Sequence, residues 1–189
     1  MRTVATRAPS DQHPPRPLDP VTRWLVLGLP VAFLAHDLGE VRGNEELNQA
    51  LADLASGSPR LARVAERMRT SDRQMAVAVS ALTAACVVVA WRAARRPAPS
   101  PAMSDFAVGT AVVGGHLVSH VAQSVLLRRP APGLAGGLLV TVPYTVVVLR
   151  RLQQRGYVDG RQTARWTAAG FVLLGPVLAA VRLLARRLA

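Results

Sequence analysis

The residues best suited to chemistry form two pairs with the same spacing. His36 and Glu40 are four positions apart, and so are His116 and His120. Residues at i and i+4 lie on one face of an α-helix, so each pair would point two side chains in one direction. Three imidazoles and one carboxylate are a ligand set that suits zinc or iron(II). The two pairs therefore predict a metal site, provided that their helices meet.

Two neighbouring polar residues fit the role of orienting these ligands. Gln123 falls on the helical face of His116, and Asp37 directly follows His36. Such residues commonly hold a ligand or a bound water by hydrogen bonds. Glu40 has two candidate roles, a catalytic base and a fourth ligand. The alternative is a buried polar cluster without metal, which would fix helix packing or relay protons.

Other catalytic and cofactor sites have little support. A di-iron site would need more ligands, such as Glu45 and Glu46, and the chain has no Ser/His/Asp triad, phosphate loop or dinucleotide fingerprint. The single cysteine, Cys86, lies in an apolar run, so a disulfide framework is excluded.

The elements that must position these residues are long and uncharged. No ionised residue occurs in the stretches 74–91, 106–127, 130–149 and 166–181. A bilayer core of about 30 Å requires roughly 20 apolar residues in helical form. Lipid offers no partner to backbone polar groups, so these stretches are expected to be helices.

The first apolar run, 24–35, is too short to cross by itself. A crossing helix at about 22–41 must take His36 and Glu40 below the headgroups, where ionisable side chains are costly and are candidates for function. His36 and His116 are expected at similar depths in the membrane, in two helices that cross it in the same direction. The sequence thus predicts that the two pairs meet at one level.

We predict an all-α fold, a polytopic membrane helix bundle with about five transmembrane helices. The expected spans are 22–41, 74–92, 105–127, 131–150 and 165–184, in a domain 21–189 that follows a disordered, proline-rich tail, 1–20. The amphipathic segment 44–70 is expected to lie in the membrane interface, or to form a lid over the end of the first helix.

The charge distribution favours lipid as the partner. All 23 basic residues are arginine, the net charge is +12, and the arginines fall mostly in short runs beside the apolar stretches. This placement fits anionic lipid headgroups, whereas a nucleic-acid-binding protein gathers its basic residues on one face. We therefore expect no nucleic-acid partner and an integral protein of the cell membrane.

The segment His36-Asp37-Leu38-Gly39-Glu40 resembles the family of small membrane proteins named for its HXXEE motif. The later His116 and His120, a Pro-Gly turn at 130–133 and a helix containing Pro143 extend the resemblance to about residues 24–150. The first glutamate of the motif is replaced by Gly39. The resemblance implies a membrane fold and a shared site, and it names no reaction.

The function expected from the residues is that of a membrane metal-dependent hydrolase or oxidoreductase acting on a lipid-like substrate; the alternative is a non-enzymatic protein.

Overall fold

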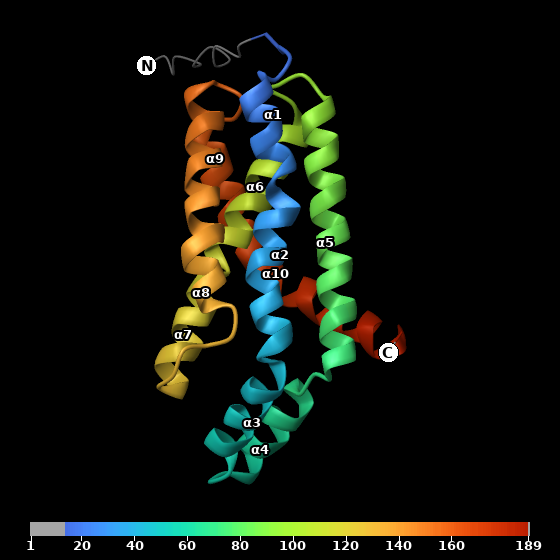
Figure 1. Cartoon of the computed structure of the whole chain (residues 1–189), viewed down its shortest axis with the longest axis vertical. Coiled ribbons are helices and arrows are strands. Elements are labelled where there is room, and N and C mark those ends of the chain that lie inside the picture. Colours follow the sequence, from blue (N-terminus) through green and yellow to red (C-terminus); the bar gives the residue numbers. More distant parts are fainter. Residues whose placement is uncertain (1–13, 189) are drawn as a thin grey trace, which may run out of the picture.

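The structure is a computed structural model in which residues 14–188 are described, apart from the side chains at 173, 174, 177, 178, 182, 184, 186 and 188. The described residues form helices and no strand, so the predicted all-α bundle is confirmed. Its long helices run side by side, and α10 crosses behind them at an angle (Figure 1).

The first candidate membrane span begins with two helices, α1 (Pro20–Leu27) and α2 (Leu29–Arg42). Helix α1 begins with Pro20 after the N-cap Asp19, whose side chain accepts a hydrogen bond from the Thr22 N–H. Pro30 has no N–H to donate, which explains an interruption at Gly28. The single helix predicted at 22–41 is thus divided.

A helical hairpin follows, formed by α3 (Asn44–Ala55) and α4 (Pro59–Met68). It projects beyond one end of the bundle, away from the end where α1 begins (Figure 1). Helix α5 (Asp72–Arg95) then returns along α2, and it starts with a capping box of Ser71 and Gln74.

The second half of the chain contains two more interrupted segments. Helices α6 (Pro101–Gly115) and α7 (Leu117–Leu127) meet at His116, where the prediction has one continuous helix at 105–127. The next segment consists of α8 (Leu134–Gly136), the π-helical turn η1 (Gly137–Thr141) and α9 (Val142–Gln154). Pro143 follows the π turn and cannot donate a backbone hydrogen bond. The last helix is α10 (Gly160–Leu188).

Within the described residues, four helical stretches are long and apolar enough to cross a membrane: Pro20–Ala55 (α1 to α3), Asp72–Arg95 (α5), Pro101–Leu127 (α6 and α7) and Leu134–Gln154 (α8 to α9). Their outer faces carry exposed apolar side chains, such as Trp24 and Leu139. The expected fifth crossing, 165–184, is part of α10, in which several side chains are not described. This crossing stays a prediction.

The apolar core occupies the end of the bundle where the chain enters. Val26, Leu29, Ala93, Phe106 and Leu152 are at most 2% exposed and form one cluster. Leu18 joins them, and Arg16 pairs with Ala98 through two backbone hydrogen bonds of 2.9 Å. Residues 16–19 therefore pack against the bundle, although the prediction placed them in a disordered tail. The first thirteen residues of that tail lie outside the described part of the chain.

Candidate metal centre

The structure brings the two predicted pairs together. His36 and Glu40 come from α2, His120 comes from α7, and His116 lies at the junction of α6 and α7. One ligating atom from each of the four lies within 4.8 Å of those from the other three. The prediction that the pairs meet at one level is confirmed.

Glu40 is at the centre of the group. Its Oε1 atom is 3.3 Å from Nε2 of His36, 3.5 Å from Nε2 of His116 and 2.7 Å from Nε2 of His120. The three imidazole rings are nearly perpendicular to one another, with interplanar angles of 86°, 87° and 86°. Three different ring planes thus direct their Nε2 atoms towards one small region.

The site is closed on one side and partly open on the other. The side chains of His36 and His120 are 3% and 4% exposed, whereas those of Glu40 and His116 are 19% and 27% exposed. A ligand or substrate would therefore reach the group on the side of His116 and Glu40.

Two of the three rings are held by their outer nitrogen. Nδ1 of His36 lies 2.9 Å from the carbonyl oxygen of Gly133, so its N–H donates to that oxygen. Nδ1 of His116 lies 3.3 Å from Oγ of Ser119, which itself donates to the His116 carbonyl and can therefore accept from the ring. Both contacts place the proton on Nδ1 and leave the Nε2 lone pair facing the group.

The donor atoms fit a small metal ion. Zinc–nitrogen and zinc–oxygen bonds of about 2.0–2.1 Å imply distances of about 3.3–3.4 Å between the ligands of a tetrahedron. Two of the distances from Glu40, 3.3 and 3.5 Å, are close to this length, and the third, 2.7 Å, is shorter. Among the described residues, Nε2 of His36 and of His120 and Oε1 of Glu40 are buried and make no contact of hydrogen-bond geometry; their close contacts are the ion-pair distances to one another. Buried polar atoms normally have partners, and a cation among these atoms would provide one.

Close backbone contacts bring the segment after α7 against the site. Gly133 has a φ of +81°, a conformation that favours glycine, and a Cβ there would lie 3.0 Å from Cγ of Glu40. At Gly137 a Cβ would lie 3.1 Å from Nδ1 of His36, and at Gly136 it would lie 2.5 Å from the Ala35 oxygen. These glycines let the turn and the π-helical segment pack directly on α2.

The other predicted site residues have different surroundings. Asp37 is buried, and its Oδ1 is 3.9 Å from Nε2 of His36, on the side of the ring away from Gly133. The expected orienting bond is thus made by a backbone oxygen. Oε1 of Gln123 is buried, and among the described residues it has no hydrogen-bond partner. The prediction that Gln123 orients a ligand is supported by no contact.

The extra carboxylates considered for a di-iron site lie elsewhere. Glu45 is exposed and pairs with Arg69 at 3.6 Å, and the backbone oxygen of Glu46 accepts a hydrogen bond from Arg129. Two glycines directly before His116 allow neighbouring helices to approach closely: a Cβ on Gly114 would lie 2.6 Å from Oγ1 of Thr145, and one on Gly115 would overlap Phe171.

Sequence reasoning missed Gly133 and Ser119 as partners of the histidines. Ser119 lies three residues after His116, a spacing at which side chains of one helix meet, so it could have been found. Nothing in the local sequence points to the carbonyl of Gly133, which lies 97 positions from His36.

The fold and site define a helical protein of the membrane type with a group of three histidines and one glutamate that could hold a metal ion. Residues 27–148 match the family described as "Protein of unknown function with HXXEE motif", and the chain belongs to this family. The sequence resemblance is thereby confirmed. No curated protein and no solved structure matches the chain.

Proposed function

We propose that His36, Glu40, His116 and His120 bind one divalent transition metal, zinc or iron(II), in an integral protein of the cell membrane. The observation that carries this proposal is the convergence of three Nε2 atoms on Oε1 of Glu40, while Gly133 and Ser119 hold two of the rings from outside. Oriented imidazoles of one tautomer are typical of metal ligands.

We further propose that the protein is a metal-dependent enzyme, a hydrolase or an oxidoreductase. Bound zinc or iron(II) supplies Lewis-acid polarisation and acidifies water, and iron(II) adds redox chemistry. His36 and His120 anchor the buried side of the site. The carboxylate of Glu40 faces the partly open side, where it can accept a proton from a substrate or a water.

The surroundings of the site support a lipid-like substrate. The four residues lie within segments that are long and apolar enough to cross a membrane. Exposed apolar side chains, including Leu38 of α2 and Val118 of α7, lie next to the site in the sequence. A substrate with an apolar chain could remain in the bilayer while its polar group reaches His116 and Glu40.

One observation favours a second function, a proton-relaying or packing cluster without metal. Oε1 of Glu40 lies 2.7 Å from Nε2 of His120, the separation of a charge pair with a protonated imidazole. This contact is shorter than the distance between two ligands of one metal ion, so the metal content decides between the two proposals.

The test is elemental analysis of the purified protein and its variants. We expect about one equivalent of metal in the wild type and a loss of most of it in His116→Ala and His120→Ala, because an incomplete ligand shell competes poorly with water. His13→Ala, at the remaining histidine of the chain, is the matched control and should retain the metal.

Glu40→Gln separates its two roles: a base can be lost while metal is retained, whereas loss of a fourth ligand lowers occupancy. Wild-type protein that stays metal-free after incubation with zinc and iron(II) would contradict the proposal and favour the proton-relay or packing cluster.

A further inference from the structure

The hairpin of α3 and α4 has an outer surface that the bundle does not cover. Helix α4 contains no buried residue, and its apolar side chains Leu61, Val64 and Met68 are 55%, 52% and 47% exposed. These residues are spaced by three and four positions, so they form one stripe along the helix. Exposed apolar stripes of this kind generally mark a surface that binds something.

The base of the hairpin is firmly attached to the bundle. The side-chain amide of Asn44, which is 2% exposed, donates to the Thr70 carbonyl and to Asp72 at 2.8 Å each. Asn48 donates to the same carbonyl at 2.8 Å, and Arg129 reaches the backbone oxygen of Glu46. The side chains of the apolar stripe of α4 take no part in these hydrogen bonds.

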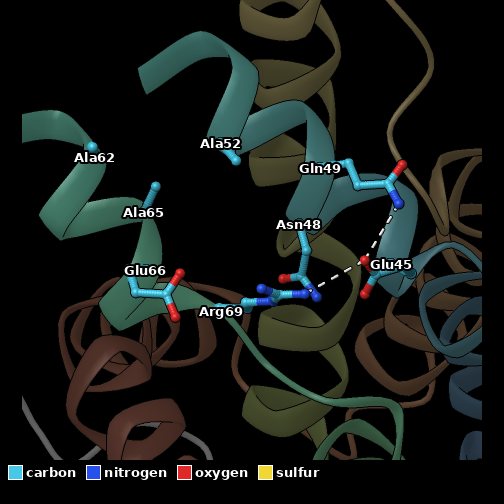
Figure 2. A pocket seen from close by; sticks show the side chains of 8 residues that line it. All are labelled: Glu45, Asn48, Gln49, Ala52, Ala62, Ala65, Glu66 and Arg69. Carbon is cyan, nitrogen blue, oxygen red and sulfur yellow. Dashed lines mark hydrogen bonds and ion pairs between the residues drawn. The ribbon is translucent and has the colours of Figure 1, made fainter. Parts of the chain in front are cut away.

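The side of α4 that faces α3 is known from the cavity between the two helices. Ala62, Ala65 and Glu66 line a cavity of about 250 Å³ together with residues of α3 (Figure 2). At 100° per residue, Leu61, Val64 and Met68 lie on a different face from this side. Arg60, Arg63 and Arg67 lie on a third face, beyond the apolar stripe.

The two arms of the hairpin carry opposite charge. Helix α3 contains Glu45, Glu46 and Asp53 and no basic residue, whereas α4 contains three arginines and one glutamate. An apolar stripe bordered by arginines is the pattern of a helix that lies in the interface of an anionic membrane. The acidic arm would be repelled by the same lipids, so the hairpin has one preferred side.

We propose that α4 lies on the anionic lipid surface of the bilayer that the bundle crosses. Leu61, Val64 and Met68 insert at the level of the headgroups, and the arginines beside them bind lipid phosphates. Two features make lipid the occupant: the charge difference between α3 and α4, and the position of the hairpin at the end of membrane-crossing helices (Figure 1). This proposal does not depend on metal binding by the His/Glu site.

The test uses the full chain with Cys86→Ser as background and a spin label at one new cysteine. A label at Val64→Cys measures the depth of the apolar stripe, and a label at Leu61→Cys measures it at a second position. A label at Asp53→Cys measures the depth of the acidic helix α3. The protein is placed in nanodiscs of phosphatidylcholine alone or with phosphatidylglycerol added. Collision with oxygen and with a water-soluble nickel reagent measures the depth of each label.

We expect anionic lipid to lower the nickel accessibility at positions 64 and 61 severalfold and to leave position 53 accessible. Arg60→Gln combined with Arg63→Gln should remove this lipid dependence. Arg161→Gln combined with Arg165→Gln, at the opposite end of the bundle, is the matched control and should preserve it.

The proposal is overturned if labels at 61 and 64 stay as accessible to nickel as the label at 53 in anionic nanodiscs. Protection that is equal in both lipids and insensitive to Arg60 and Arg63 also contradicts it. Spin–spin broadening at position 64 would show that a second copy of the chain covers the stripe, which equally rejects lipid as the occupant.

Discussion

The carbonyl oxygen of Gly133 lies 2.9 Å from Nδ1 of His36 in the buried interior of the protein. Gly133 adopts a φ of +81°, which strains any other residue. The orientation of a candidate metal ligand thus depends on a backbone conformation in the turn after α7.

Gly133→Ala should therefore weaken metal binding by about 10-fold to 100-fold, as is typical when the partner of a ligating histidine is disturbed. Backbone strain should also lower the free energy of unfolding by about 1–2 kcal/mol. Competition titration with a chelator measures the affinity, and thermal unfolding measures the stability. Gly57→Ala is the control, since a Cβ there would meet nothing within 4 Å. Unchanged affinity in Gly133→Ala would show that the turn does not orient His36.

Ser119→Ala removes the hydroxyl that accepts from Nδ1 of His116. We expect metal affinity to fall by about 10-fold, because the ring loses the bond that fixes its tautomer and orientation. The stability of the metal-free protein should change little, since Ser119 is only partly buried. Ser80→Ala, at an exposed serine of α5, should have the wild-type affinity. Equal affinities in the two variants would contradict the role given to Ser119.

The ligand set could be predicted from sequence because it depends on local spacing. A pair at i and i+4 identifies a helical face, and the length of an apolar run predicts how deep His36 and His116 would lie in a bilayer. The uncharged stretches likewise indicated the helices, since the need to satisfy the backbone in lipid leaves few alternatives.

The backbone partner of His36 could not be predicted in the same way. A backbone carbonyl such as that of Gly133 has no residue-specific signal, and its position depends on how the turn packs on α2. The interruption at Gly28 has a local cause in Pro30. The interruption at His116, by contrast, depends on tertiary packing, because histidine does not end a helix by propensity alone. The apolar length at 105–127 therefore predicted one helix where the structure has two.

The carboxyl group of Asp19 should make the free energy of unfolding depend on pH in the acid range. Hydrogen bonds from Thr22 and from Arg151 hold the pKa of this carboxyl well below its usual value of 3.8, against the opposing effect of burial. The pKa is lower in the folded state than in the unfolded state. The stabilisation is therefore fully present above the unfolded pKa and is lost as the pH falls through the folded one.

Asp19→Asn keeps an N-cap side chain and removes the charge. We expect it to lower the free energy of unfolding by about 1 kcal/mol at neutral pH, a modest value because the Asp19–Arg151 pair is partly exposed. The difference from the wild type should shrink below about pH 4. Thermal unfolding in detergent between pH 7 and pH 3 measures it. Arg151→Gln should reduce the effect of Asp19→Asn; a difference that is independent of both pH and Arg151 would contradict this account.

Substitution by alanine should have opposite effects on stability at Gly39 and at Gly109. Both lie within helices, where alanine is favoured over glycine by about 1 kcal/mol. A Cβ on Gly109 would meet nothing within 4 Å, so Gly109→Ala should stabilise the protein. A Cβ on Gly39 would lie 3.0 Å from both the N and the Cα atoms of Gly133. Backbone atoms cannot rotate away as a side chain can, so Gly39→Ala should destabilise by about 1–3 kcal/mol.

Gly39 also stands where the family motif has its first glutamate, so Gly39→Glu tests the same contact with a larger side chain. We expect it to displace the turn at Gly133, and with it the oxygen that binds His36, so that metal affinity falls together with thermal stability. Gly109→Glu is no control here, because it would place a charge in a membrane-crossing helix; Gly109→Ala serves instead. If Gly39→Ala and Gly109→Ala both raise the unfolding temperature, the close contact between Gly39 and Gly133 does not exist in the folded protein. If Gly39→Ala is destabilising but retains full metal affinity, the turn supports the fold without orienting His36.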